Sequence, residues 1–303
     1  MDTTETADEA VGATKPVVGM IHAGALPGTP GQRQTVDELV AAACAEARLY
    51  RDAGVESLML ENMHDVPYLR GGVGPEIVAA MTVLAHEVRR ESGGSLPIGL
   101  QVLAAADLEA LAVAHAAGLD FIRTECFCFA HVADEGLMQS NAAKLLRYRR
   151  TIGATGVQVW ADIKKKHAAH SLTADLTIGD IAEAAEFMGA ETVIVTGTRT
   201  GRPPQPWEVA EARDHCNLPV FVGSGVDVGN LGELLSVSDG VIVGSHFKRG
   251  GHWANEIDPA RVDAFMAELR RVRGVEAPAP PPTVPGASAQ RIEFPPFPQQ
   301  PRQ

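Results

Sequence analysis

Two glycine-rich turns near the end of the chain hold the residues best suited to binding a charged ligand. Each turn follows a short apolar run, over residues 219–222 and 240–243. Unpaired backbone N–H groups at such turns bind phosphate oxygens, and glycine allows close approach because it has no Cβ. The predicted phosphate-binding residues are Gly223, Ser224, Gly225, Gly244 and Ser245. Phosphate sites of this kind form after the last two strands of a (β/α)8 barrel.

The rest of the chain contains the six further units that such a barrel requires. Short apolar runs alternate with segments of helical periodicity, at about 25 to 35 residues per unit, which argues for parallel strands. An open doubly wound sheet would give the same alternation. The count of eight units, and the lack of a clear GxGxxG motif after the first strand, favour closure. We therefore predict an α/β fold with a single (β/α)8 TIM barrel over residues 15–274.

Local signals place several helices of this barrel. Thr35 and Glu38 form the capping box of the first helix, and Pro75 begins the second. Asp107 is expected to cap the third helix. The fourth is expected over residues 137–151, after a long loop.

Polar residues follow the predicted strands at the ends where a barrel of this type builds its active site. The catalytic candidates are Glu61, Asp162, Glu125, His22 and Lys164, and the further substrate-binding candidates are Asn62, Gln101, Arg123 and Thr196. The carboxylates leave the second, fourth and fifth strands, on the half of the barrel that faces the glycine turns. We therefore expect the glycine turns and the acidic residues to open into one cavity.

The acidic candidates have a structural alternative. Glu61 and Asp162 suit a general base, or a group that stabilises a developing oxocarbenium ion. A structural ion pair would explain the same charges without catalysis. Glu125 has this alternative too, with Arg123 as its expected partner.

Lys164 and His22 would supply further chemistry. Lys164 suits a clamp for substrate charge or a Schiff-base amine, although a solvated lysine is the ordinary alternative. His22 suits a general acid or base, and a packing histidine is the competing interpretation. A divalent metal held by His22 and the carboxylates can be drawn, but no HExxH or paired-histidine spacing supports it. We therefore assign no metal ligand and no cofactor.

The charge of the chain limits its partners. The 303 residues carry a formal net charge of −12, which argues against nucleic acid or an anionic membrane surface as the main partner. A local basic pocket is compatible with this charge, at residues 164–166 or 248–249. No run approaches the roughly 18 apolar residues of a membrane span, so we expect no integral membrane segment.

The two ends of the chain differ from the predicted barrel. Residues 1–14 are acidic and polar, unlike a signal or transit peptide, and residues 275–303 are rich in proline. Both ends are predicted to be disordered. Four cysteines in a chain without a signal peptide indicate reduced thiols and a cytoplasmic protein.

Several stretches together resemble the BtpA/SgcQ family over residues 16–273. They are Gly19-Met20-Ile21-His22, Glu61-Asn62, Gln101-Val102-Leu103, Phe121-Ile122-Arg123-Thr124-Glu125, the run from Ala161 to His167, Thr196-Gly197-Thr198 and Gly223-Ser224-Gly225-Val226. The resemblance implies a TIM barrel of the ribulose-phosphate-binding type. The family takes its name from photosystem I biogenesis in cyanobacteria, where its members are peripheral proteins at the thylakoid surface. Its chemistry is poorly defined, so the resemblance speaks to the fold more than to the reaction.

The first functional hypothesis is an enzyme that acts on a phosphorylated sugar or a nucleotide-like metabolite. Its reaction would be transfer or cleavage at a glycosidic C–N or C–O bond, or lyase or isomerase chemistry at a sugar phosphate. The second hypothesis is a non-enzymatic assembly factor for a photosystem or another membrane complex. Ionisable residues at several strand ends favour the enzyme, because a scaffold has no use for charges in a closed pocket. We also expect a homo-oligomer.

Overall fold

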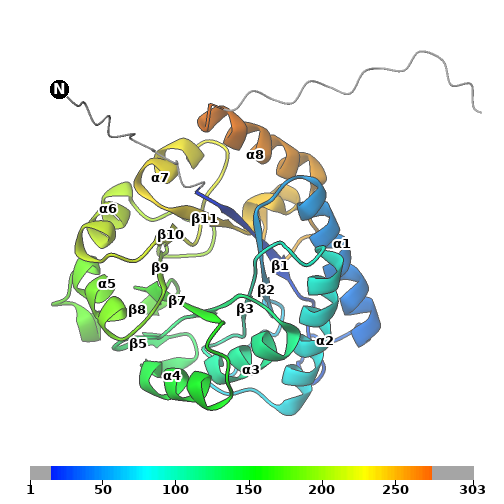
Figure 1. Cartoon of the computed structure of the whole chain (residues 1–303), viewed down its shortest axis with the longest axis horizontal. Coiled ribbons are helices and arrows are strands. Elements are labelled where there is room, and N and C mark those ends of the chain that lie inside the picture. The colour runs from blue at the N-terminus through cyan, green and yellow to red at the C-terminus, as the bar shows by residue number, and fades with distance from the viewer. Residues whose placement is uncertain (1–14, 275–303) are drawn as a thin grey trace, which may run out of the picture.

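The computed structural model describes residues 15–274, in which eight parallel strands close into a barrel (Figure 1). Neighbouring strands follow the order β1-β11-β10-β9-β7-β4-β3-β2, and β2 pairs with β1 to complete the ring. The strands are β1 (Val17–His22), β2 (Ser57–Glu61), β3 (Ile98–Gln101), β4 (Phe121–Thr124), β7 (Gln158–Ile163), β9 (Thr192–Val195), β10 (Val220–Val222) and β11 (Gly240–Val243). The prediction of an α/β fold with a single TIM barrel is confirmed. The predictions for residues 1–14 and 275–303 lie outside the described residues.

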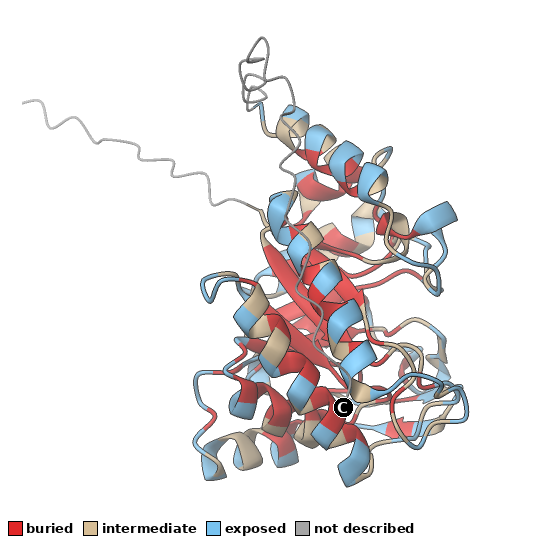
Figure 2. Cartoon of the chain, turned by 90° about the vertical axis from the view of Figure 1, so that its right-hand side faces the viewer, coloured by how far each residue is buried: buried red, intermediate tan, exposed pale blue. Residues whose placement is uncertain are grey.

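Helices surround the barrel and cover its outer face (Figures 1 and 2). They are α1 (Val36–Asp52), α2 (Pro75–Glu91), α3 (Asp107–Ala117), α4 (Ala142–Thr151), α5 (Ile178–Phe187), α6 (Pro206–His215), α7 (Leu231–Val237) and α8 (Pro259–Val272). The capping box of α1 is present, since Glu38 N donates to Thr35 Oγ1 and Thr35 N donates to Glu38 Oε2. No helix within residues 15–274 is long and apolar enough to cross a membrane.

The segment before α4 differs from the prediction. A small antiparallel sheet forms beside the barrel, in the order β6-β5-β8, from β6 (Gly136–Gln139), β5 (Ala130–Ala133) and β8 (Ala168–Ala169). Met138 is buried while its neighbours are not, which is the period of two that a strand requires. The helix expected over residues 137–151 therefore begins only at Ala142, after this strand has ended.

Asp107 is the first residue of α3, and the prediction that it caps this helix was wrong. Its Oδ2 accepts hydrogen bonds from Thr124 Oγ1 at 2.6 Å and from Asn141 Nδ2 at 2.8 Å. Burial raises the pKa of Asp107 to about 7, and the two hydrogen bonds oppose this rise. The carboxyl group thus ties α3 to the end of β4 and to the start of α4.

The interior of the barrel is filled by one cluster of large side chains. Its members are Val18, Met20, Met59, Phe121, Trp160, Ile194, Phe221 and Ile242. The rings of Phe121 and Trp160 stack with their centroids 3.8 Å apart, and Phe221 packs against Trp160 at 4.7 Å. A second, larger cluster lies between the strands and the helices. The barrel is therefore a packed core, and only its ends are open to ligands.

Two glycines make room for these rings. A Cβ on Gly99 would lie 2.1 Å from the ring of Phe121, and a Cβ on Gly240 would lie 2.3 Å from the ring of Phe221. Both distances are shorter than any carbon contact permits. Small residues on β3 and β11 are thus the counterpart of large rings on the neighbouring strands β4 and β10.

We expect Gly99→Ala to destabilise the barrel by about 1 to 3 kcal/mol, because Phe121 is held by Trp160 and cannot move aside. The matched control is Gly156→Ala, where no atom lies within 4 Å of the added Cβ. Urea unfolding of both variants measures the effect. Equal midpoints for the two variants would show that the interior is not packed as described.

Candidate active site

Two adjoining cavities open at the carboxyl ends of the barrel strands. One has a volume of about 210 Å³ and is lined by both glycine turns; we call it the glycine compartment. The other has a volume of about 240 Å³ and is lined by Gln101, Glu125, Asp134 and Glu135; we call it the acidic compartment. The residues that line both are Glu61, Met63, Arg123, Lys166 and Thr200. The two compartments therefore meet at Glu61 and Arg123.

The glycine compartment contains all five predicted phosphate residues. Gly225 adopts φ 71°, and a Cβ there would lie 2.0 Å from Pro203 N, so the loop before α6 also requires this glycine. Ser224 Oγ donates to Arg202 O and accepts from Gly197 N, which leaves its backbone as the part free to meet a ligand. Helix α7 begins at Leu231, after this glycine turn.

Two cations line the glycine compartment that the sequence did not identify individually. Arg261 comes from α8, and its Nε donates to His246 O at 2.6 Å. Lys166 lies in the basic run after β7, and burial lowers its pKa, with nearby Arg123 adding to the effect. Arg261 gave no sequence signal because it lies inside an ordinary amphipathic helix. Lys166 was visible only as one member of a lysine run.

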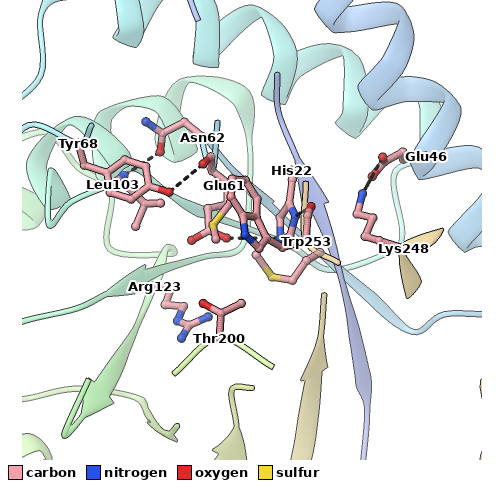
Figure 3. A network of polar contacts seen from close by, with 12 residues as sticks. His22, Glu46, Glu61, Asn62, Tyr68, Leu103, Arg123, Thr200, Lys248 and Trp253 are labelled. Carbon is pink, nitrogen blue, oxygen red and sulfur yellow. Dashed lines mark hydrogen bonds and ion pairs between the residues drawn. The ribbon is translucent and has the colours of Figure 1, made fainter. Parts of the chain in front are cut away.

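His22 and Glu61 face each other at the base of the glycine compartment. His22 Nε2 lies 3.7 Å from Glu61 Oε2, and the side chains are only 5% and 9% exposed. The Nδ1 of His22 donates to the carbonyl oxygen of Trp253 at 3.0 Å, so a neutral imidazole carries its lone pair on Nε2. Figure 3 shows His22 between Trp253 and the carboxyl group of Glu61.

Burial shifts both members of this couple toward their neutral forms. It lowers the pKa of His22 to about 3, and the positive charge of Lys248 lowers it further. It raises the pKa of Glu61, against the opposing charges of Lys166 and Arg123. A carboxyl group that binds a proton more readily thus faces a weakly basic imidazole nitrogen, which leaves Glu61 as the group of the pair that is suited to transfer protons. This arrangement suits general acid and base chemistry.

Asp162 forms a two-point ion pair with Arg123. Arg123 Nε and Nη2 each donate to one Asp162 oxygen at 3.0 Å, and the side chains are 3% and 1% exposed. Asp162 therefore uses both oxygens on Arg123, which lines both compartments. This contact makes Asp162 a residue that positions Arg123, the structural alternative considered from the sequence.

Glu125 pairs with a different cation from the one expected. Lys165 Nζ lies 3.2 Å from Glu125 Oε1, and Ala105 N donates to Glu125 Oε2 at 3.1 Å. The expected partner, Arg123, is engaged by Asp162. Glu125 lines the acidic compartment with its charge compensated.

Two of the remaining candidates hold the loops around the cavity. Asn62 Nδ2 donates to Asp65, and Asn62 Oδ1 accepts from Leu103 N at 2.7 Å. Thr196 Oγ1 accepts from Lys166 N at 3.2 Å. Lys164 lines a separate small cavity beside α5. Lys164 has a φ of 50°, which ends the extended backbone of β7 and changes the direction of the chain. As a result, Lys166 lines the glycine compartment and Lys164 does not.

Within residues 15–274, no group of three or more histidine, cysteine, aspartate or glutamate side chains is arranged to hold a metal ion. The metal ligands that could be drawn from the sequence were His22, Glu61, Glu125 and Asp162. Of these, Asp162 and Glu125 already face cations of the protein, and one nitrogen of His22 is held by a carbonyl.

A sequence model of the BtpA family matches residues 13–271. The chain belongs to the BtpA family. An uncharacterized mitochondrial protein of Caenorhabditis elegans is 41% identical to it, over 86% of this chain and 95% of the relative. The photosystem I biogenesis protein BtpA of Synechocystis sp. is 34% identical, over 84% of this chain and 88% of the relative. The resemblance inferred from the sequence motifs is confirmed.

Solved structures share the fold of this BtpA-family chain at low identity. Thiamine phosphate pyrophosphorylase from Pyrococcus furiosus has a TM-score of 0.55 and 12% identity, over 86% of this chain and 98% of its own. Phosphoribosyl anthranilate isomerase from Thermus thermophilus has a TM-score of 0.53 and 13% identity, over 85% and 100%. These similarities establish the barrel, because at such identity only the fold can be compared.

His22 is expected to lower the stability of the protein as the pH falls. Its pKa is about 3 in the folded protein and near 6.5 in the unfolded chain, so only the unfolded chain gains a proton between these values. From about pH 7 to about pH 5, the wild type should lose roughly 2 kcal/mol more unfolding free energy than His22→Gln. Urea unfolding at both pH values measures this difference. The exposed His86→Gln variant is the control, and a loss in His22→Gln as large as in the wild type would exclude a buried neutral imidazole.

Asp162→Asn is expected to cost about 3 to 5 kcal/mol of stability, because it leaves the buried Arg123 without its countercharge. The double variant Arg123→Met/Asp162→Leu removes both charges and should recover most of this loss. Glu87→Gln breaks an exposed pair with Arg90 and should change stability by less than about 1 kcal/mol. Denaturant titration compares the variants, and an Asp162→Asn protein as stable as Glu87→Gln would refute the positioning role.

Proposed function

We propose that this BtpA-family protein is an enzyme that acts on a phosphorylated small molecule. The phosphate binds in the glycine compartment, and the His22–Glu61 couple transfers protons to or from the substrate. The observation that carries the proposal is that both glycine turns, the couple and the three cations Arg123, Lys166 and Arg261 line one cavity of about 210 Å³. One small ligand can therefore contact both the groups that would bind an anion and the groups that would transfer a proton.

The electrostatics of the glycine compartment suit a phosphate. Arg261 and Lys166 supply positive charge, and the glycine turns supply backbone N–H groups without side chains in the way. The names of both structural neighbours contain a phosphorylated compound, which supports the proposal by analogy of fold.

The groups that the three carboxylates face favour one reaction class. Cleavage at an anomeric carbon commonly uses two free carboxyl groups. Here Asp162 and Glu125 face cations, and Glu61 faces a neutral imidazole. A single carboxyl–imidazole couple fits proton transfer at a sugar phosphate, as in an isomerase or lyase, with Arg123 stabilising negative charge that develops beside it. Glycosidic transfer is the second choice.

The alternative function, an assembly factor, has support from the name of the Synechocystis relative, a photosystem I biogenesis protein. A buried couple with displaced pKa values at a cavity is more typical of a catalytic site than of a docking surface. We therefore place the enzyme first.

Calorimetric titration with ribose 5-phosphate, ribulose 5-phosphate and unphosphorylated ribose tests the proposal. The sugar phosphates should bind and ribose should not, and Arg261→Gln should weaken binding by about tenfold or more, because it removes a cation from the compartment. In D₂O, the wild type should exchange the carbon-bound proton beside the carbonyl of a bound sugar phosphate, which NMR detects. Glu61→Gln should bind and not exchange.

Arg271→Gln is the matched control for Arg261→Gln, since Arg271 lies on the same helix and pairs with Glu268 at the surface. It should bind sugar phosphates like the wild type. Equal affinity for ribose and ribose 5-phosphate would contradict the phosphate site. Exchange that persists in Glu61→Gln would remove Glu61 from the reaction.

A further inference from the structure

The acidic compartment contains buried polar atoms without partners. Gln101 is 2% exposed, and its Oε1 has no hydrogen bond within the described part of the chain. Glu135 Oε2 is buried and likewise lacks a hydrogen bond, with Lys165 Nζ at 3.6 Å. Both side chains line the same compartment. A buried acceptor without a hydrogen bond is costly to keep, so Gln101 Oε1, beside a Glu135 oxygen that has only a long ion pair, indicates a ligand that brings N–H or O–H donors.

The walls of the acidic compartment carry aromatic rings. Tyr68 and Trp253 line it together with the apolar side chains of Leu103 and Met63. The Tyr68 hydroxyl donates to Met63 O at 2.8 Å, and the backbone of Trp253 is held by His22. Figure 3 shows the Tyr68 ring on the side of Glu61 away from His22. Rings held in place offer flat faces on which a planar ligand group can stack.

The two compartments differ in charge. The cations Arg123 and Lys166 line both compartments. Apart from the shared residues, the glycine compartment has the cation Arg261 and the anion Asp227, whereas the acidic compartment has Asp134, Glu135 and Glu125 against the cation Lys165. An anionic group is therefore favoured at one end and a group with hydrogen-bond donors at the other. Because the compartments meet at Glu61, one ligand can span both and present its middle to the His22–Glu61 couple.

We propose that the acidic compartment is a subsite for a planar nitrogen heterocycle with N–H donors. The substrate is then a sugar phosphate that carries such a ring, as a nucleoside monophosphate does. Gln101 and Glu135 accept the hydrogen bonds of the ring, and Tyr68 and Trp253 flank it. This inference rests on the proposed function only for the phosphate of the substrate, which binds in the glycine compartment. It adds the chemical class of the group that binds in the acidic compartment.

Titration of the full chain with AMP, CMP and ribose 5-phosphate tests the subsite. At least one nucleotide should bind about tenfold or more tightly than ribose 5-phosphate, because its ring satisfies buried acceptors. Gln101→Leu should remove most of this gain and leave the affinity for ribose 5-phosphate unchanged. Its melting temperature should rise, since it deletes an unpaired buried polar group. Glu135→Gln gives a second variant that should also reduce the gain.

The exposed Gln139 on β6 supplies the control, and Gln139→Leu should bind every ligand like the wild type. Nucleotides that bind no more tightly than ribose 5-phosphate would overturn the subsite and leave the proposed function standing. A nucleotide gain that survives in both Gln101→Leu and Glu135→Gln would also overturn it. Absence of binding by every phosphorylated ligand would contradict both proposals.

Discussion

The buried ion pair between Arg123 and Asp162 is the interaction on which the rest of the site depends. A guanidinium that is 3% exposed requires a partner, because an unpaired buried charge is strongly destabilising. Asp162 from β7 meets two nitrogens of Arg123 from β4, so the arginine has one fixed position. From that position it lines both compartments. A contact between neighbouring strands thus determines the charge at the centre of the cavity.

The same electrostatic constraint separates the three carboxylates that leave the strands. Asp162 and Glu125 each lie at ion-pair distance from a cation of the protein, Arg123 and Lys165 respectively. Glu61 instead faces the uncharged imidazole of His22, and burial raises its pKa. Burial also raises the pKa of Glu125, so what distinguishes Glu61 is that, within the described residues, no lysine or arginine lies at ion-pair distance from it. The cations that the acidic residues meet, and not the number of acidic residues at the rim, distinguish Glu61 from the other two carboxylates.

Strands and loops contribute different parts of this BtpA-family site. The ends of the strands and the two glycine turns build the glycine compartment, which is the part most closely tied to the barrel. The acidic compartment depends on loops, because Tyr68, Trp253, Asp134 and Glu135 all lie outside the barrel strands. The compartment built by strand ends is thus tied to the fold, whereas loop residues of the other compartment can differ without a change in the barrel.

The sequence by itself determined the barrel, the glycine turns and the set of polar residues at the strand ends. Those features follow from periodicity and turn chemistry, which act over a few residues. Only the tertiary structure decided which charges pair, because Arg123 and Asp162 are 39 residues apart and meet only when β4 and β7 lie side by side. It also decided that Lys166, and not Lys164, lines the cavity, since a φ of 50° at Lys164 redirects the chain. Which buried charges pair depends on which side chains lie close together, and this is settled only when the strands of the barrel are in place.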